Sequence, residues 1–153
     1  MSGEIVNVFE LAVEADDTDP PGYRSRMGRF GPSIGASQLG GTVYELDPGQ
    51  SVCPYHYEFP EEEWLLVLVG RPTLRDPDGE HELAVGDLVL FPAGPDGAHK
   101  VTNRTEEPVR IFMFSNVAEA GFSVYPDSGK TNVWPLKKIF RIDDAVDYWV
   151  GEA

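Results

Sequence analysis

Two histidines lie near glutamates in the central part of the chain, and together these residues could bind a metal ion. His56 and Glu58 are two positions apart, Glu63 follows five residues later, and His99 lies further along the sequence. Side chains at positions i and i+2 of a β-strand leave the same face, so His56 and Glu58 are expected to point to one site. Neutral imidazoles and carboxylates suit one divalent transition metal (Zn, Fe, Mn or Ni) better than a metal that prefers thiolates.

The segments that carry these residues are predicted to be short strands. Strand-forming runs bounded by Gly and Pro occupy 42–46, 52–58, 64–69, 72–75, 80–84, 88–91, 99–103 and 109–114, and 121–125 and 138–142 could add two more. The run 76–79, Asp-Pro-Asp-Gly, favours a type I turn and therefore a hairpin. Residues 143–149 could form one or two helical turns. Short strands at intervals of roughly 8–12 residues predict an all-β sandwich or barrel.

Two motifs in this region resemble those of the cupin superfamily. The first comprises Gly49, His56, Glu58, Glu63 and Gly70, and the second comprises Gly86, Pro92, Gly94, His99 and Asn103. The resemblance implies a double-stranded β-helix, that is, a jelly-roll barrel, with a metal at its centre. The chain is then expected to comprise an N-terminal arm and loop (1–40), a barrel core (41–118) and a C-terminal extension (119–153) that completes the barrel or a dimer. The match is closest to small, single-domain bacterial cupins without a firmly assigned activity.

The sequence departs from the cupin pattern at Glu58, where the family usually has a second histidine. If Glu58 binds the metal, the ligands are His56, Glu58, Glu63 and His99, and the two carboxylates cancel the charge of a divalent ion. If it does not, two histidines and Glu63 remain, which is the ligand set of non-haem Fe(II) oxygenases. Glu58 would then be free to act as a catalytic general base. The i, i+2 spacing favours binding to the metal.

Other polar residues near the motifs have simpler interpretations. Glu61 and Glu62 compete with Glu63 as a ligand, but counting back from Gly70 favours Glu63. His81 lies beside the predicted turn and is expected at the surface. Cys53 is three residues from His56, so a regular strand would direct it away from the metal. Three arginines, Arg24, Arg26 and Arg29, could bind an anionic substrate, but salt bridges to this acidic chain are the simpler expectation.

Composition limits the partners that the chain can have. Asp and Glu number 26 against 12 Lys and Arg in 153 residues, giving a formal net charge of -14. This excess argues against nucleic acid and against anionic membranes. A single cysteine, no signal-peptide pattern and no apolar run of about 20 residues favour a cytoplasmic protein. Exposed edge strands and an aromatic tail favour a homodimer.

The motifs support two classes of function. The first is a metal-dependent enzyme that acts on a small molecule as a dioxygenase, lyase or isomerase, because a metal and a spare carboxylate are both available. The alternative is a non-catalytic module that binds or senses a small ligand. The sequence does not identify the substrate.

Overall fold

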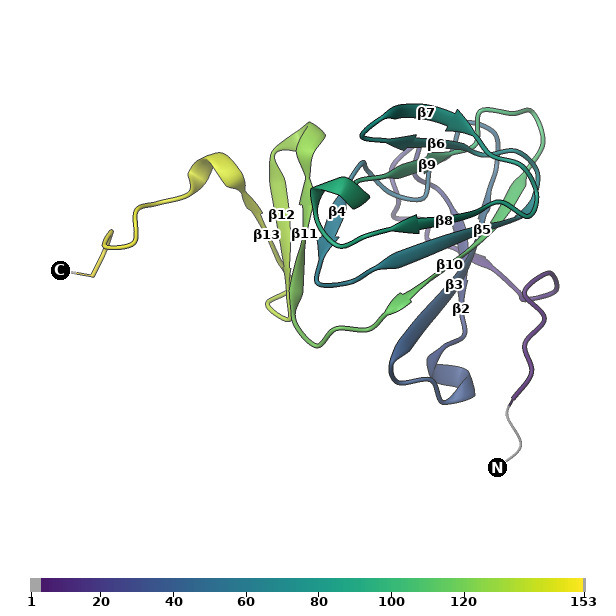
Figure 1. Ribbon diagram of the computed structural model, residues 1–153, viewed down its shortest axis with the longest axis horizontal. Coiled ribbons are helices and arrows are strands. Elements are labelled where there is room, and N and C mark those ends of the chain that lie inside the picture. The colour runs from purple at the N-terminus through teal and green to yellow at the C-terminus, as the bar shows by residue number, and fades with distance from the viewer. Residues whose placement is uncertain (1–3, 153) are drawn as a thin grey trace.

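The computed structural model describes residues 4–152, which form an all-β jelly-roll barrel (Figure 1). The predicted fold class is therefore confirmed. The helical elements of the described residues are four single 3-10 turns: η1 (Pro32–Ile34), η2 (Pro95–Gly97), η3 (Pro126–Ser128) and η4 (Ile142–Asp144). No helix in this part of the chain is long and apolar enough to cross a membrane.

One layer of the barrel is a six-stranded antiparallel sheet with the strand order β1-β2-β3-β10-β5-β8. Its strands are β1 (Glu14–Ala15), β2 (Arg26–Arg29), β3 (Leu39–Leu46), β10 (Val109–Asn116), β5 (Glu63–Val69) and β8 (Leu88–Phe91). In β5 the side chains of Leu65 and Val67 are fully buried, as the alternation of the sequence predicts. Glu63 shares their parity and therefore points to the inside of the barrel.

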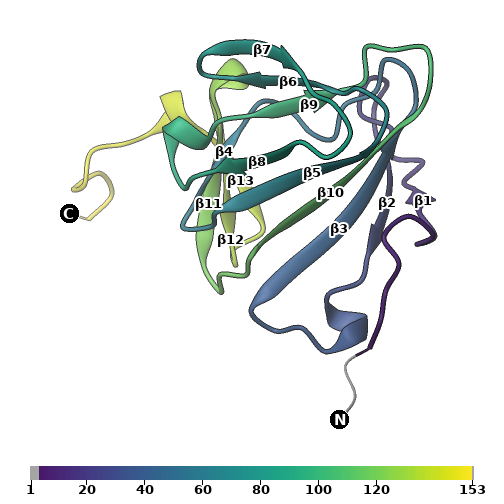
Figure 2. The ribbon, with the colours of Figure 1, turned by 45° about the vertical axis from the view of Figure 1, so that its right-hand side comes forward.

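The opposite layer consists of two smaller sheets that backbone bridges connect. A three-stranded sheet contains β7 (Gly79–Glu82), β6 (Thr73–Asp76) and β9 (Lys100–Thr102), and β6 and β7 form the predicted hairpin. A four-stranded sheet contains β13 (Lys138–Arg141), β12 (Lys130–Trp134), β11 (Gly121–Tyr125) and β4 (Tyr57–Phe59). The bridges Ser51–Thr102 and His56–His99 run between them. Figure 2 shows this layer facing the six-stranded sheet across the barrel.

The core lies between the two layers and is almost entirely aliphatic. Its buried members are Leu46, Leu65, Val67, Leu74, Leu83, Phe91, Val101, Val109, Ile111 and Met113. Two of these residues also adjoin the metal-ligand candidates: Phe91 stacks on His99, and Met113 lines the same cavity as His56 and Glu63. The packed core therefore supports the candidate site directly.

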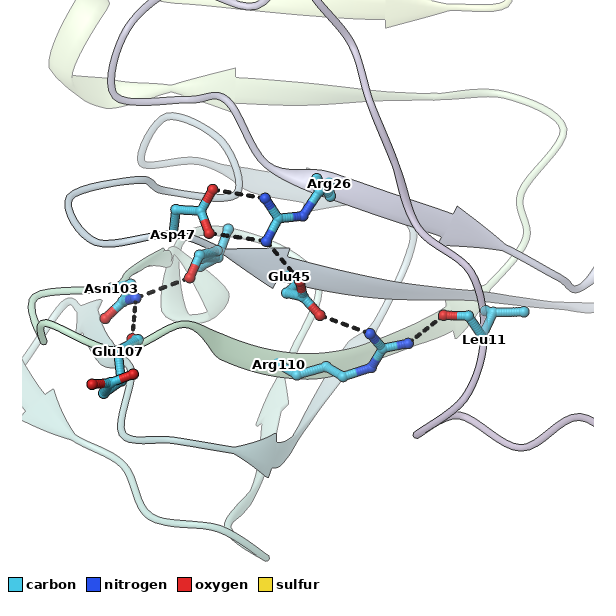
Figure 3. Close-up of polar contacts among 8 residues, drawn as sticks. Leu11, Arg26, Glu45, Asp47, Asn103, Glu107 and Arg110 are labelled. Atoms are coloured by element: carbon cyan, nitrogen blue, oxygen red, sulfur yellow. Dashed lines mark hydrogen bonds and ion pairs between the residues drawn. The ribbon is translucent and has the colours of Figure 1, made fainter.

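The N-terminal arm covers the outer face of the six-stranded sheet and is attached to it by ionic groups (Figure 3). Arg110 donates to the backbone oxygens of Val8 and Leu11 and, at 2.9 Å, to Glu45 Oε2. Glu45 also pairs with Arg26, at 2.6 Å. Gly28 permits this contact, because a Cβ there would lie 2.5 Å from the oxygen of Ala12, in the arm.

Two expectations about secondary structure were wrong in part. The predicted strand 52–58 is reduced to β4, because Cys53-Pro54 lies in a bend in which the side chains do not alternate. The predicted helical turns over 143–149 are limited to η4. Beyond η4 the chain extends away from the barrel (Figure 1), and Tyr148 and Trp149 are exposed. These two rings of the aromatic tail therefore do not pack on the described part of the barrel.

Candidate metal centre

The two histidines of the motifs face each other across a single antiparallel bridge. His56 N donates to His99 O at 3.1 Å, and His99 N donates to His56 O at 2.8 Å. Directly opposed residues in an antiparallel pair send their side chains to the same face, so both imidazoles point into the barrel. Their ring centroids lie 4.7 Å apart. Phe91 stacks on His99 with the ring centroids 3.7 Å apart, which fixes that ring in place.

Glu63 completes the group from the opposite layer. Its Oε2 atom lies 3.5 Å from His99 Nε2 and 4.0 Å from His56 Nε2. One ligand atom from each of His56, Glu63 and His99 can be chosen so that all three lie within 4.8 Å of one another. Three of the four predicted ligands therefore come together, although they are separated by as many as 43 residues in the sequence.

The hydrogen bonds of the histidines leave their Nε2 atoms available for a metal. His99 Nδ1 lies 2.9 Å from the oxygen of Gly97, and His56 Nδ1 lies 3.1 Å from the oxygen of Pro54. Each Nδ1 can carry its proton and donate it to a carbonyl, which is the usual arrangement behind a metal-bound imidazole. His99 Nε2 is fully buried and has no hydrogen-bond partner among the described residues. A buried lone pair without a donor fits a metal ion.

The electrostatics of the group also favour a bound cation. Burial lowers the pKa of His56, and it lowers the pKa of His99 to about 3, so both rings are neutral at pH 7. Burial raises the pKa of Glu63 to about 8, and the charges of Glu58 and Glu61 add to this shift. A divalent ion would offset the cost of keeping Glu63 ionised among other carboxyls.

Glu58 lies beside the three-residue group but is not part of it. Its Oε1 atom is 3.9 Å from His56 Nε2 and accepts a hydrogen bond of 2.9 Å from Ser123 Oγ. Ser123 lies directly opposite Glu58 in the pairing of β11 with β4, which aligns the two side chains. Burial raises the pKa of Glu58, and hydrogen bonds from Ser123 and Glu61 act in the opposite direction.

Glu61 has a more specific place than a solvated loop residue. Its Oε1 accepts the backbone N–H of Ala118 at 2.7 Å, and its side chain is hydrogen-bonded to Glu58. Burial raises its pKa, and the neighbouring Glu58 adds to the shift. Two half-buried carboxyls in contact favour sharing a proton, so Glu58 and Glu61 can exchange one. Glu62 is exposed, as expected.

A cavity of about 300 Å³ opens beside the three-residue group. His56, Glu58 and Glu63 contribute to its wall, together with residues that the motifs did not single out, such as Tyr44, Ser115 and Tyr125. The Tyr125 ring is nearly parallel to His56, at 5.8 Å between centroids. Ser123 and Tyr125 lie on a strand whose pairing partner is β4, and no local sequence signal indicates that pairing.

Cys53 was expected to face away from the metal ligands, and this expectation was wrong. Its Sγ lies 3.4 Å from His56 Nδ1, and it lines the cavity. The bend before β4 breaks the alternation on which the expectation depended. Burial raises the pKa of its thiol far above the ordinary range, so Cys53 is neutral.

The remaining candidates are structural or exposed. His81 pairs with Asp76 at 3.1 Å on the exposed hairpin. Asn103 is buried and donates to the backbone oxygens of Leu46 and Glu107, so it stabilises a turn (Figure 3). Of the three arginines, Arg26 forms the expected salt bridges, with Glu45 and Asp47.

The fold is an all-β jelly roll, and two histidines and a glutamate converge inside it where they could hold a metal ion. Residues 42–115 match the family model described as Cupin domain, and this part of the chain is a small cupin-2 type domain. Among curated proteins, no sequence matches the chain.

Solved structures share the fold over nearly the whole chain. One is a Silicibacter pomeroyi protein described as a sugar phosphate isomerase from a cupin superfamily. It has a TM-score of 0.81 at 23% identity, and the match covers 95% of this chain and 98% of that protein's chain. A proposed sugar phosphate isomerase of Acidithiobacillus ferrooxidans has the same TM-score at 22% identity, with 92% and 91% covered. A predicted oxalate decarboxylase of Thermotoga maritima has a TM-score of 0.62 at 18% identity, with 75% and 100% covered. At these identities the similarity establishes the fold.

Proposed function

We propose that this chain is a metal-dependent enzyme that moves a proton on a small molecule, the chemistry of an isomerase or lyase. The observation that carries the proposal is the position of Glu58. It lines the cavity beside three convergent metal-ligand candidates and makes its hydrogen bonds to Ser123 and Glu61. A carboxylate that lies next to a metal without being one of its ligands is well suited to act as a general base.

Each residue has a defined task in this scheme. His56, Glu63 and His99 would hold a divalent transition metal (Zn, Fe, Mn or Ni), which would polarise a carbonyl or hydroxyl oxygen of the substrate. Glu58 takes a proton from the adjacent carbon or oxygen. The hydroxyl of Ser123 holds Oε1 of Glu58 in place, at 2.9 Å. Glu61 is hydrogen-bonded to Glu58 and is less buried, so it offers a path for that proton to solvent.

The test is hydrogen–deuterium exchange at carbon, followed by NMR in D₂O. The two structural neighbours called sugar phosphate isomerases make dihydroxyacetone phosphate and glyceraldehyde 3-phosphate the first compounds to test, with the unphosphorylated triose and pyruvate beside them. We expect exchange with at least one compound. Glu58→Gln should reduce its rate by roughly 100-fold or more while the metal is retained. Glu62→Gln, in the exposed connection between β4 and β5, is the matched control and should have no effect.

Other outcomes would contradict the proposal in distinct ways. If Glu58→Gln removes the metal, Glu58 is a ligand and the site has two histidines and two glutamates. If every tested compound binds but none exchanges, the alternative of a non-catalytic ligand-binding module gains support.

A second candidate activity is oxygenation. The group His56, Glu63 and His99 has the two-histidine, one-carboxylate composition of non-haem Fe(II) oxygenases. This candidate predicts oxygen consumption by the iron-loaded protein with the same compounds. Oxygen uptake without exchange at carbon would favour it over proton transfer.

We also propose that two copies of the chain form a homodimer through an aromatic face on the outside of the six-stranded sheet. Its rings are in contact, with centroid distances of 5.6 Å (Phe30–Phe112), 5.1 Å (Phe112–Phe114) and 6.0 Å (Trp64–Phe114). Next to it, Leu90 is 42% exposed, and a hollow of about 260 Å³ is lined only by Gly and apolar residues.

The occupant that fits this face is a second copy of the chain. Copies with a net charge of -14 repel each other, and this uncharged face lets them approach. Light scattering after size-exclusion chromatography should give the mass of a dimer, and Leu90→Glu the mass of a monomer. Leu136→Glu, which adds the same charge on an exposed turn, is the control. A monomeric wild type at micromolar concentration would contradict the proposal.

A further inference from the structure

The three arginines near the N-terminus have different environments. Arg26 is neutralised by Glu45 and Asp47 on the outer face of the sheet. Arg24 donates its Nε–H to the backbone oxygen of Asp19. Arg29 makes no ion pair and no side-chain hydrogen bond with any residue that the structure describes. Arg24 also lacks a carboxylate partner, but Arg29 is the one of the three whose exposed guanidinium is bonded to no described residue.

Strand β2 directs Arg29 to the inner side of the sheet. Gly28 faces the arm on the outer side, where a Cβ would meet Ala12 and Leu11. The neighbouring positions therefore face inward, and Met27 lines the cavity beside the metal-ligand group. Arg29 is opposite Thr42 in the pairing of β2 with β3, and Thr42 also lines that cavity. Register and parity agree in placing Arg29 at the rim of the cavity.

Tyr44 lies on β3, two positions from Thr42, which is the residue opposite Arg29. It pairs with Met27 and belongs to the wall of the cavity. Burial raises the pKa of its hydroxyl to about 12; the charge of Arg29 acts against this shift, and the charge of Glu63 adds to it. Arg29 and Glu63 are thus both within electrostatic reach of one hydroxyl.

The charges around the cavity are separated. Among the described residues that line it, the charged side chains are Glu58 and Glu63, and none is Lys or Arg. An anionic group of a ligand would be repelled by Glu58 at the metal end. It would be attracted to Arg29, which register and parity place beside Thr42 on the β2 side of the cavity. A guanidinium binds carboxylates and phosphates through paired hydrogen bonds, and it is the residue type suited to this task.

We propose that Arg29 binds an anionic group, a carboxylate or a phosphate, of the small molecule whose other end lies at the metal. This proposal rests on the proposed function, because it names the substrate class of the same cavity. Arg29 is then a specificity residue: it selects acidic substrates and orients them with their reacting carbon beside Glu58.

The experiment measures the binding of three matched probes to manganese-loaded protein by calorimetry. Glycerol 3-phosphate carries a phosphate, glycerate carries a carboxylate, and glycerol carries neither. We expect at least one charged probe to bind more tightly than glycerol. Arg29→Gln should weaken that binding roughly tenfold or more, since it removes a charge-assisted pair, and should leave glycerol unchanged. Arg24→Gln removes the same charge from the same region and should change no affinity.

The comparison of the two charged probes identifies the anion, and either preference supports the proposal. The proposal is overturned if Arg29→Gln binds the charged probes as tightly as the wild type does. It is also overturned if Arg24→Gln lowers the affinity for these probes as much as Arg29→Gln does. Metal content, measured on the same samples, separates this failure from a failure of the metal site. The exchange assay with Glu58→Gln separates it from a failure of the proposed reaction.

Discussion

The buried carboxyl of Glu63 makes the stability of the metal-free protein depend on pH in a specific way. Its pKa is about 8 in the folded chain, because of burial first and the charges of Glu58 and Glu61 second, against 4.5 for the ordinary group. Between these values the folded chain holds a proton that the unfolded chain has lost. The contribution is fully present below pH 4.5 and is lost as the pH rises through 8.

The interval chosen for the measurement is pH 6.5 to 8. Below 6.5 the histidines act in the opposite direction, because the pKa values of His56 and His99 are lowered by burial and their stabilising effect grows with pH. At pH 6.5 the unfolded histidines are still half protonated, so their effect fades over the next pH unit and returns up to about 0.8 kcal/mol in the interval. Glu63 lowers the free energy of unfolding by about 1.6 kcal/mol over the same interval, so the net fall should be about 1 kcal/mol.

The assay is urea unfolding of chelator-treated protein at several pH values, monitored by tryptophan fluorescence. Glu63→Gln is the control, since a neutral amide replaces the protonated carboxyl and cannot titrate. Saturating metal should also remove the slope, because the ion holds Glu63 ionised. A wild-type slope of zero without metal, or an equal slope in Glu63→Gln, would refute this view of the site.

Further predictions concern the packing that supports the site. Gly28→Val should destabilise the fold by about 1–3 kcal/mol, because its side chain would collide with the backbone of Ala12; thermal unfolding would measure this, and an unchanged midpoint would argue against the arm contact. Arg110→Met removes the bonds to Glu45 and to the arm, so proteolysis should cut the arm faster than in wild type while the barrel stays intact. Ile111→Ala should cost about 2–5 kcal/mol in chemical denaturation, since the residue is fully buried in the core; a loss below 1 kcal/mol would be inconsistent with that packing.

The sequence predicts that His56, Glu63 and His99 lie together, because the cupin-like motifs and strand parity point to the same residues. Glu63 starts a strand whose alternation with Leu65 and Val67 fixes its inward direction. His56 and His99 occupy the expected motif positions, and a single backbone bridge brings them together. Strand parity and motif spacing were sufficient for these residues.

The rest of the site depends on long-range pairing that the sequence does not display. Ser123 reaches Glu58 only because β11 adds to β4, 65 residues earlier in the chain. Cys53 adjoins His56 because the chain bends before β4, so parity was a poor guide there. Arg29 resembled its neighbours Arg24 and Arg26 in the sequence, and only the register of β2 with β3 separates them.

The central claim is that His56, Glu63 and His99 bind one divalent transition metal. Its most direct test is elemental analysis of protein purified without chelator and supplemented with Zn, Fe, Mn or Ni. The variant His99→Ala is purified, supplemented and analysed in the same way. We predict about one equivalent of metal per chain in the wild type and loss of that metal in the variant. Less than about a tenth of an equivalent in the supplemented wild type, or full occupancy in His99→Ala, would contradict the claim.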